Sequence, residues 1–378
     1  MSPAMNLVAE TERENELPES LSQKGVIYLC KKGIENVPTK YILPPLERPN
    51  LSYTSTNSSS HNLNLPIIDF SQLQGSNRSH VLNSLATACE EYGFFQLVNH
   101  GIPNQVISNM FDVAKRFFKL PFEERSKYMS TDMGSAVRCG TSFNQNKDSV
   151  FCWRDFLKLS CQPYSDVLPL WPSSPTDLRQ TTFDYSKELK NLYLMLVDAI
   201  LENLGLLENS KEEDESKNGS CGLEEFEDGS QLIVMNCYPS CPEPELTLGM
   251  TPHSDYGFLT LLLQDQLVKG LQILHGGNWV NVEPIPNSFV VNVGDHLEIF
   301  SNGKYQSVLH RVLATSTSRI SVASLHSLPF NRMIQPAPKL VNEANPSRYK
   351  PTDFASFLDY NSSSEPRQKS FLDSRKLT

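Results

Sequence analysis

Short apolar runs dominate the second half of the chain. Six of them lie between residues 231 and 328, and most are bounded by Gly, Pro, Asn or Asp. They read QLIVMNCYP, GFLTLLLQD, GLQILHGGNWVNV, SFVVNVGD, SVLHRVL and RISVASLHSL. Short runs separated by turn residues are typical of β-strands rather than of helices. Their close succession predicts an antiparallel double sheet or a barrel.

The first half mixes two kinds of apolar pattern. Residues 65–71 and 94–100 are short apolar runs that predict strands, whereas residues 77–91 and 105–120 have apolar positions at helical spacing. Residues 185–206 carry a longer stripe of leucines and isoleucine at the same spacing, which predicts a long helix with one buried face. The whole pattern indicates an α+β protein that is mainly β.

The same patterns divide the chain into segments. The first segment is polar and charged with little to bury, which predicts disorder. We expect a disordered N-terminus (1–22), a mixed α/β N-terminal region (65–170), a linking helical region (171–207), an acidic loop (208–230), a strand-rich domain (231–330) and a C-terminal helical segment with a tail (331–378).

Charge narrows the range of partners. The formal net charge is -10, and residues 208–228 alone hold nine acids and two lysines, a balance of 2 − 9 = −7. An acidic chain without a basic patch is repelled by phosphate backbones, so we expect no nucleic-acid partner. The apolar runs are too short to span a bilayer, and the first twenty residues lack the apolar core of a signal peptide. We therefore expect a cytoplasmic protein that makes no membrane contact.

The strand-rich region holds a candidate metal site. His253 and Asp255 are two residues apart, a spacing that puts both side chains on one face of an extended segment. His310 supplies a second imidazole from a distant strand. Two imidazoles and one carboxylate bind one face of an octahedral ion and leave three positions open, as in non-haem Fe(II) oxygenases. A zinc hydrolase is the alternative for such a set, and His275 and His326 are alternative third ligands.

Arg319 and Ser321 follow the candidate metal histidine on the next predicted strand. A 2-oxo dicarboxylate that chelates iron at one end leaves a free carboxylate at the other. The guanidinium fork matches that carboxylate with two parallel hydrogen bonds, and a hydroxyl two residues along the strand points to the same side. This pair favours an iron site built for a dicarboxylate over a generic metal site.

Taken together, these segments resemble a known family, the plant soluble 2-oxoglutarate/Fe(II)-dependent dioxygenases. Within this family, the chain resembles flavanone 3-dioxygenase-like and downy-mildew-resistance-type oxygenases, and melatonin hydroxylases are also similar. The matching segments read LPIIDFS, CEEYGFFQLVNHGI, FFKLPFEERSKY, WRDFLKL, MNCYPSCPEPELTLGMTPHSD, LTLLLQD, GLQIL, NSFVVNVGDHLEIFSNGKYQSVLHRV and RISVASLHSLP.

The resemblance implies a double-stranded β-helix (jelly-roll) core with a helical N-terminal cover. It implies that His253, Asp255 and His310 are the Fe(II) ligands and that Arg319 and Ser321 bind 2-oxoglutarate. Tyr238 and Asn236 match further positions that hold this co-substrate. The implied reaction consumes 2-oxoglutarate and O₂, releases succinate and CO₂, and hydroxylates or desaturates a substrate, with ascorbate as the reductant.

The substrate is less constrained than the reaction. We expect apolar and aromatic contacts, with Phe143, Tyr256 and Phe330 as candidates. The sequence has no cluster of lysines or arginines of the kind that binds a phosphorylated or CoA-linked substrate. A small aromatic or terpenoid specialised metabolite or hormone is therefore favoured. Two alternatives stay open: an oxidase of the ethylene-forming type that needs no 2-oxoglutarate, and a non-catalytic metabolite-binding jelly roll. We expect a monomer whose partner is a small molecule.

Overall fold

A computed structural model of the chain describes most of its length. The described residues are 21, 23–50, 64–142, 145, 148–207, 223–363 and 371–377. The predicted disorder of the N-terminus, most of the predicted acidic loop and the candidate contact Phe143 lie outside the described residues.

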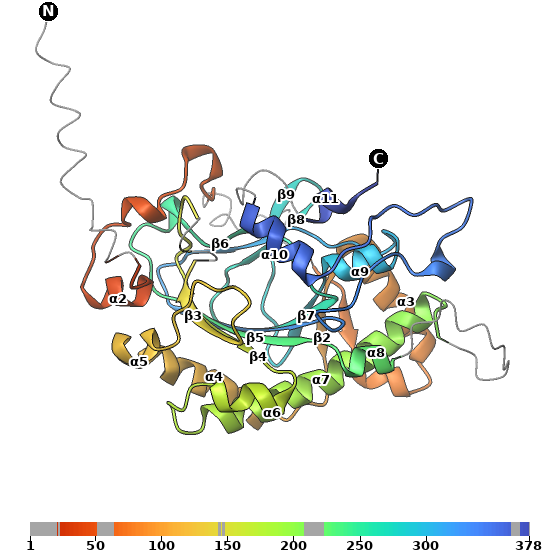
Figure 1. Ribbon diagram of the computed structural model, residues 1–378, viewed down its shortest axis with the longest axis horizontal. Coiled ribbons are helices and arrows are strands. Elements are labelled where there is room, and N and C mark those ends of the chain that lie inside the picture. Colours follow the sequence, from red (N-terminus) through yellow and green to blue (C-terminus); the bar gives the residue numbers. More distant parts are fainter. Residues whose placement is uncertain are drawn as a thin grey trace, which may run out of the picture.

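Two sheets form the core of the structure and lie over one another (Figure 1). Neighbouring strands are antiparallel, except that β1 and β2 are parallel. The large sheet has the order β1 (Ile67–Asp69), β2 (Phe94–Val98), β10 (Phe289–Val293), β7 (Leu259–Gln264), β12 (Arg319–His326), β5 (Gln231–Tyr238), β4 (Asp155–Ser160) and β3 (Val137–Thr141). The small sheet has the order β6 (Leu248–His253), β11 (His310–Leu313), β8 (Leu271–His275) and β9 (Asn278–Asn281).

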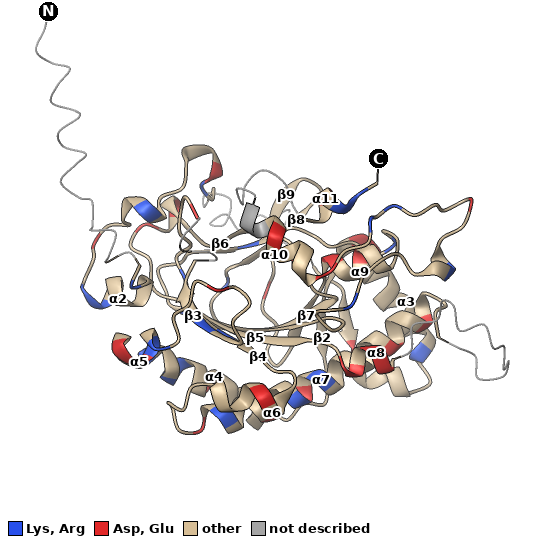
Figure 2. Ribbon diagram, viewed as in Figure 1, with Lys and Arg blue, Asp and Glu red and all other residues tan. Residues whose placement is uncertain are grey.

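Helices cover the face of the large sheet that points away from the small sheet (Figure 1). The three main ones are α3 (Arg78–Thr87), α4 (Asn104–Lys119) and α7 (Leu178–Asn203). The other α-helices are α2 (Val26–Lys31), α5 (Phe122–Ser126), α6 (Tyr164–Val167), α8 (Glu224–Glu227), α9 (Asp295–Phe300), α10 (Phe354–Ser363) and α11 (Phe371–Arg375). Charged residues lie along the helices of this outer layer (Figure 2). This arrangement matches the predicted jelly-roll core with helical cover.

Alternation along the strands separates the apolar core from a central cavity. On β5, Ile233 and Met235 are fully buried in the core beneath the helices, whereas Val234, Asn236 and Tyr238 line the cavity between the sheets. Successive side chains of a strand point to opposite faces, so one strand serves both environments. The cavity side is where the candidate site residues lie.

Several elements differ from the expectation. The pattern did not predict β3 and β4, because their polar and charged residues break the apolar runs. The run GLQILHGGNWVNV forms the hairpin of β8 and β9 rather than one strand. The helix expected from residue 185 begins at Leu178. The end of the predicted acidic loop contains α8, because Phe226 is fully buried and packs against Phe258.

Within the described part of the chain, no helix is both long enough and apolar enough to cross a membrane. The cysteines that the structure describes are all free thiols.

A buried carboxylate attaches the N-terminal helix α2 to the large sheet. Asp155 of β4 accepts hydrogen bonds from the backbone N–H groups of Val26 (2.8 Å) and Ile27 (3.1 Å). Arg125 pairs with the same carboxylate at 3.3 Å, and both side chains are almost fully buried. Gly25 has a φ of 92°, and a Cβ there would lie 2.6 Å from Asp155 Oδ1. The turn into α2 therefore requires glycine.

Replacing Asp155 with alanine leaves Arg125 as a buried charge without its carboxylate partner. We expect Asp155→Ala to lower the free energy of unfolding by about 3–5 kcal/mol, measured by urea denaturation. The control is Glu124→Ala, which removes an exposed ion pair with Lys127 and costs less than about 1 kcal/mol. A loss at Asp155 no larger than that at Glu124 would contradict this account.

Candidate active site

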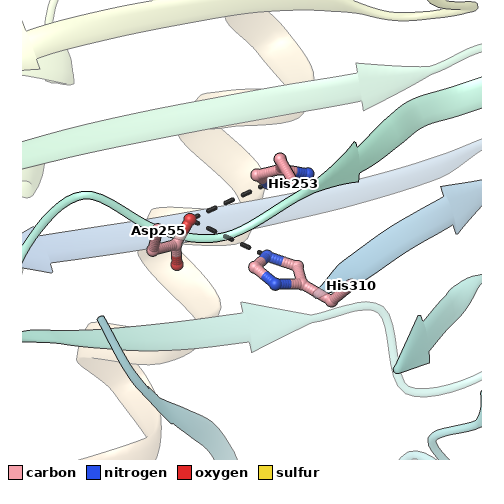
Figure 3. Close-up of side chains that lie close together, drawn as sticks. All are labelled: His253, Asp255 and His310. Carbon is pink, nitrogen blue, oxygen red and sulfur yellow. Dashed lines mark ion pairs between the residues drawn. The ribbon is translucent and has the colours of Figure 1, made fainter. Parts of the chain in front are cut away.

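Strand pairing brings the predicted triad together. His253 ends β6 and Asp255 lies two residues further on, while His310 begins β11 directly opposite His253. Asp255 Oδ1 lies 3.8 Å from His253 Nε2 and 3.7 Å from His310 Nε2 (Figure 3). These three residues also form the group of side chains whose ligand atoms converge as a metal site requires, among the residues that the structure describes.

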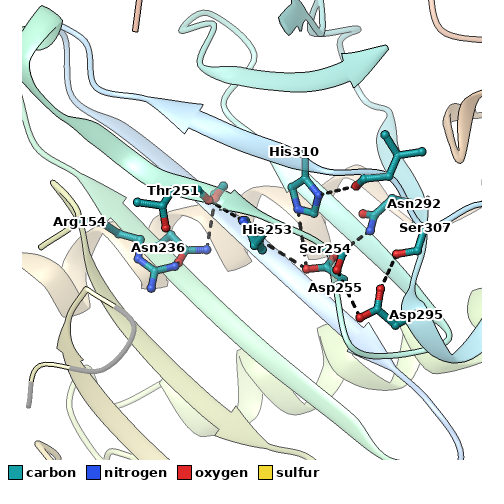
Figure 4. A network of polar contacts seen from close by, with 12 residues as sticks. Arg154, Asn236, Thr251, His253, Ser254, Asp255, Asn292, Asp295, Ser307 and His310 are labelled. Atoms are coloured by element: carbon teal, nitrogen blue, oxygen red, sulfur yellow. Dashed lines mark hydrogen bonds and ion pairs between the residues drawn. The ribbon is translucent and has the colours of Figure 1, made fainter. Parts of the chain in front are cut away.

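Hydrogen bonds orient each member of the triad. His253 Nδ1 lies 2.8 Å from the Thr251 carbonyl oxygen, and His310 Nδ1 lies 3.3 Å from that of Val308. A carbonyl oxygen only accepts, so each Nδ1 carries the proton and each Nε2 lone pair is free for a metal. Asn292 of β10 donates to Asp255 Oδ2 at 2.8 Å, which leaves Oδ1 directed at the imidazoles (Figure 4).

The charge state of the triad suits a divalent cation. Burial lowers the pKa of His253 to about 3, so its imidazole is neutral at neutral pH. Burial acts to raise the pKa of Asp255, but the neighbouring His310 and His253 outweigh it and the net pKa is lowered. Bonds from imidazole nitrogen or carboxylate oxygen to such an ion are about 2.1 Å, so two ligand atoms of one ion lie within roughly 4.2 Å of each other. The distances of 3.8 Å and 3.7 Å meet that limit, and the donor set fits Fe(II).

The predicted clamp lies on neighbouring strands of the large sheet. Arg319 and Ser321 of β12 pair with Tyr238 and Asn236 of β5, respectively. Asn236 Nδ2 donates to Ser321 Oγ at 3.4 Å, and the Arg319 guanidinium lies 5.3 Å from the centre of the Tyr238 ring. Gln264 accepts a hydrogen bond from Arg319 Nη2 at 3.1 Å. All four predicted residues line the cavity that also holds the triad.

Arg319 is a buried cation with incomplete hydrogen bonding. Its side chain is 2% exposed, and Nε and Nη1 have no hydrogen-bond partner among the described residues. A buried charge left unpaired is costly, and a carboxylate ligand supplies the missing acceptors. Backbone lies close on both sides: a Cβ at Gly270 would be 3.4 Å from Arg319 Cδ, and a Cβ at Gly249 would be 2.7 Å from the Tyr238 ring. The clamp thus fits the distal carboxylate of 2-oxoglutarate.

One cavity of about 1360 Å³ connects the triad and the clamp to the C-terminal helices. Tyr256, one of the predicted substrate contacts, lines it and packs on Phe357 of α10 with ring centres 4.2 Å apart. Phe330, the second, also lines it and stacks on Phe354 at 4.3 Å. Sequence reasoning missed the α10 and α11 aromatic residues, including Phe371, because the C-terminal segment carries no motif that connects it with the triad.

The alternative third ligands lie elsewhere. The His326 ring stacks on Tyr193 with centres 4.3 Å apart, and its Nε2 lies 2.8 Å from Ser324 Oγ. His275 stacks on Tyr92 at 5.3 Å. Neither belongs to the converging group, so His310 is the third member of the triad.

A second polar network, which the sequence did not indicate, supports the turn that carries Asp255. Asp295 at the start of α9 accepts hydrogen bonds from Ser254 Oγ (3.2 Å) and Ser307 Oγ (2.7 Å) (Figure 4). Its backbone N–H donates to the Asp255 carbonyl at 2.7 Å. Burial raises the pKa of Asp295 to about 7. Only the pairing of distant segments brings these residues to the triad, so no local sequence signal identifies them.

Comparison with known proteins gives the same picture from sequence and from structure. Residues 229–327 match the model of the 2OG-Fe(II) oxygenase superfamily, and residues 65–177 match that of the non-haem dioxygenase in morphine synthesis N-terminal region. DMR6-LIKE OXYGENASE 1 of Arabidopsis thaliana is 42% identical over 86% of this chain and 89% of its own length. Flavanone 3-dioxygenase 2 of Oryza sativa subsp. japonica is 38% identical over 84% and 87%.

The crystal structure of JOX2 in complex with 2OG, Fe and JA is similar in fold. It superposes with a TM-score of 0.81 and 31% identity over 94% of this chain and 98% of that one. The likeness therefore extends over nearly the whole chain. This chain belongs to the 2OG-Fe(II) oxygenase superfamily and is an Fe(II)/2-oxoglutarate-dependent dioxygenase.

Proposed function

We propose that this chain hydroxylates or desaturates a small aromatic or terpenoid specialised metabolite or hormone, with succinate and CO₂ as co-products. One observation carries the proposal. The triad and the buried, incompletely bonded Arg319 open onto the same cavity, whose far wall is aromatic. Metal, co-substrate and substrate positions are then contiguous, which a coupled oxidation requires.

His253, Asp255 and His310 are the proposed iron ligands. Fe(II), when bound, supplies the activation of O₂ and the oxidative decarboxylation of 2-oxoglutarate. Backbone carbonyls accept from Nδ1 of both imidazoles, so both Nε2 lone pairs stay free for the metal. Asn292 donates to Asp255 Oδ2 and leaves Oδ1 free. These second partners fix ligand orientation and raise ligand basicity.

The proposed co-substrate site comprises Arg319, Ser321, Tyr238 and Asn236. Arg319 Nε and Nη1 are free to bind the distal carboxylate, and Ser321 Oγ, which already accepts from Asn236, can donate to it. Because Arg319 Nε and Nη1 have no hydrogen-bond acceptor among the described residues, we favour an enzyme that uses 2-oxoglutarate over an oxidase of the ethylene-forming type. The presence of both triad and clamp favours an enzyme over a non-catalytic binding protein.

Aromatic residues support the proposed substrate class. Tyr256 and Phe330 belong to a wall with Phe354, Phe357 and Phe371, and such a surface binds apolar rings. Relatives named flavanone 3-dioxygenase and jasmonate-induced oxygenase indicate plant metabolites or hormones of this kind. Phe143 is proposed as a further contact, on sequence alone. The proposal includes ascorbate as the reductant that keeps the iron ferrous, a monomeric chain and a cytosolic location.

Metal binding tests the triad. We expect Asp255→Ala to abolish stoichiometric Fe(II) binding, and Asn292→Ala to weaken it by about 10–100-fold because the carboxylate loses its orienting partner. The measurement is anaerobic equilibrium dialysis against Fe(II). Glu283→Ala, which removes an exposed carboxylate paired with Lys269, serves as the control and should bind Fe(II) as the unsubstituted chain does. Unchanged Fe(II) affinity in Asp255→Ala would refute the assignment.

Co-substrate kinetics test the clamp. We expect Arg319→Gln to raise the KM for 2-oxoglutarate about 100-fold, since two charge-assisted hydrogen bonds of about 1.5 kcal/mol each are lost. The KM of Arg319→Lys should lie between those of the unsubstituted chain and Arg319→Gln, because lysine keeps the charge but not the planar fork. Succinate release with Fe(II), ascorbate and a panel of phenolic, indole and terpenoid substrates provides the readout. Arg116→Gln, on the exposed face of α4, is the matched control. A KM for Arg319→Gln equal to that of the control would argue against the clamp.

A further inference from the structure

A second group of cations lines the cavity, on β3, on β4 and at the residue directly before β4. Phe156 and Lys158 of β4 and Arg154, directly before β4, all line the cavity. Arg138 on β3 pairs directly opposite Lys158. Like charges directly opposite each other in a sheet are unfavourable. Along the sequence these residues are separated, and only the β3–β4 hairpin collects them. The sequence shows no basic cluster, but the folded chain places three cations on one wall of the cavity.

The two arginines are buried against the same ring. Arg138 is 5% exposed and Arg154 is 6% exposed, and their guanidinium carbons lie 5.1 Å and 5.0 Å from the centre of the Phe156 ring. Guanidinium groups stack favourably on an aromatic face. Phe156 thus holds two cations at the cavity wall and also presents apolar surface to a ligand.

The hydrogen-bond partners of Arg154 and Lys158 among the described residues are neutral. Arg154 donates to Asn236 Oδ1 (3.1 Å) and to the Ser142 carbonyl (2.9 Å), while its Nε has no partner among the described residues. Lys158 donates to the Met133 carbonyl at 2.7 Å.

Two carboxylates near this wall act on Arg138. Asp148 and Asp132 raise the pKa of Arg138, whereas burial and Arg154 lower it, with the net pKa lowered. None of the described residues forms an ion pair with Arg154. The buried Arg154 charge consequently lacks the counter-charge that such a group ordinarily has.

Arg154 borders the proposed co-substrate site but is not one of its residues. Strand β5 lies between β4 and β12, and Asn236 on β5 is bonded to Arg154 on one side and to Ser321 on the other. His253 lies beside this chain of contacts, on the opposite sheet (Figure 4). A ligand held at Arg154 would therefore have its body next to the metal site while Arg319 remains available for 2-oxoglutarate.

We infer that the substrate is an organic monocarboxylic acid whose carboxylate binds Arg154, with Arg138 beside it, and whose apolar body lies on Phe156 and extends toward the metal. This inference rests on the proposed function and narrows its substrate class: an acid is favoured over a neutral polyphenol. Arg154 is then both a substrate contact and, through Asn236, a neighbour of the co-substrate. The test must separate these two roles.

The experiment compares acids with their uncharged amides. Calorimetry is done without O₂, on the full chain loaded with Fe(II) and 2-oxoglutarate, using trans-cinnamate with cinnamamide and 2-naphthylacetate with 2-naphthylacetamide. We expect at least one acid to bind about tenfold or more tightly than its amide, as hydrogen bonds to charged groups imply. In Arg154→Gln that preference should vanish and amide affinity should stay within a few-fold, while Arg154→Lys should retain part of it.

Controls separate substrate binding from general charge and from folding. Arg48→Gln removes the same charge from another residue that lines the cavity, and it should keep the preference for acids. Thermal melting of every variant shows whether it is folded. A preference for acids that survives Arg154→Gln, or that Arg48→Gln removes equally, overturns the inference. So does an unsubstituted chain that binds no acid of the panel more tightly than its amide.

Titration of 2-oxoglutarate into the same samples distinguishes the two proposals. Failure of 2-oxoglutarate to bind the unsubstituted, Fe(II)-loaded chain means that the proposed function is wrong. Normal 2-oxoglutarate binding together with equal affinity for acid and amide means that only the assignment of Arg154 is wrong. If Arg154→Gln loses 2-oxoglutarate affinity and keeps the preference for acids, Arg154 is a positioning residue for Asn236 and not a substrate contact.

Discussion

Everything at the site depends on the register of antiparallel strands whose two faces lie in different environments. On β5 and β12, one face is buried beneath α4 and α7, and the other carries Asn236, Tyr238, Arg319 and Ser321 into the cavity. A slip of one residue would reverse every side chain of a strand, sending the clamp into the apolar core. The fully buried Met235 and Val322, paired across these strands, resist that slip. The hydrophobic core therefore also determines where the chemistry lies.

The small sheet makes the complementary contribution. Pairing of β6 with β11 sets His310 opposite His253, and the turn after β6 returns Asp255 to both. That turn is held by hydrogen bonds from α9 and β10, elements that also belong to the frame of the fold. The proposed metal ligands and the proposed co-substrate clamp thus lie on two opposed sheets, and the packing of the sheets sets their separation.

Sequence reasoning succeeded where chemistry is local. The two-residue spacing of His253 and Asp255, and the same spacing of Arg319 and Ser321, report strand faces directly, and the structure brings each pair together as expected. It failed where chemistry depends on pairing between distant segments. Asn292 reaches the triad from another strand. The α10 and α11 aromatic residues reach the cavity from the end of the chain, without a periodic signal that connects them to it.

The position of the second cationic group in the sheet has a consequence for specificity. Strand β3 is at the edge of the large sheet and β4 is next to it, whereas the clamp on β5 and β12 has strands on both sides. An edge strand is constrained by one neighbour, so substitutions on its cavity face disturb fewer contacts than those on a central strand. Arg138 can therefore change with little effect on Arg319 or on the triad. The proposed substrate contacts thus include Arg138 at the sheet edge and residues of the C-terminal helices, whereas the proposed co-substrate residues lie on central strands, with the bond between Arg154 and Asn236 joining the two groups.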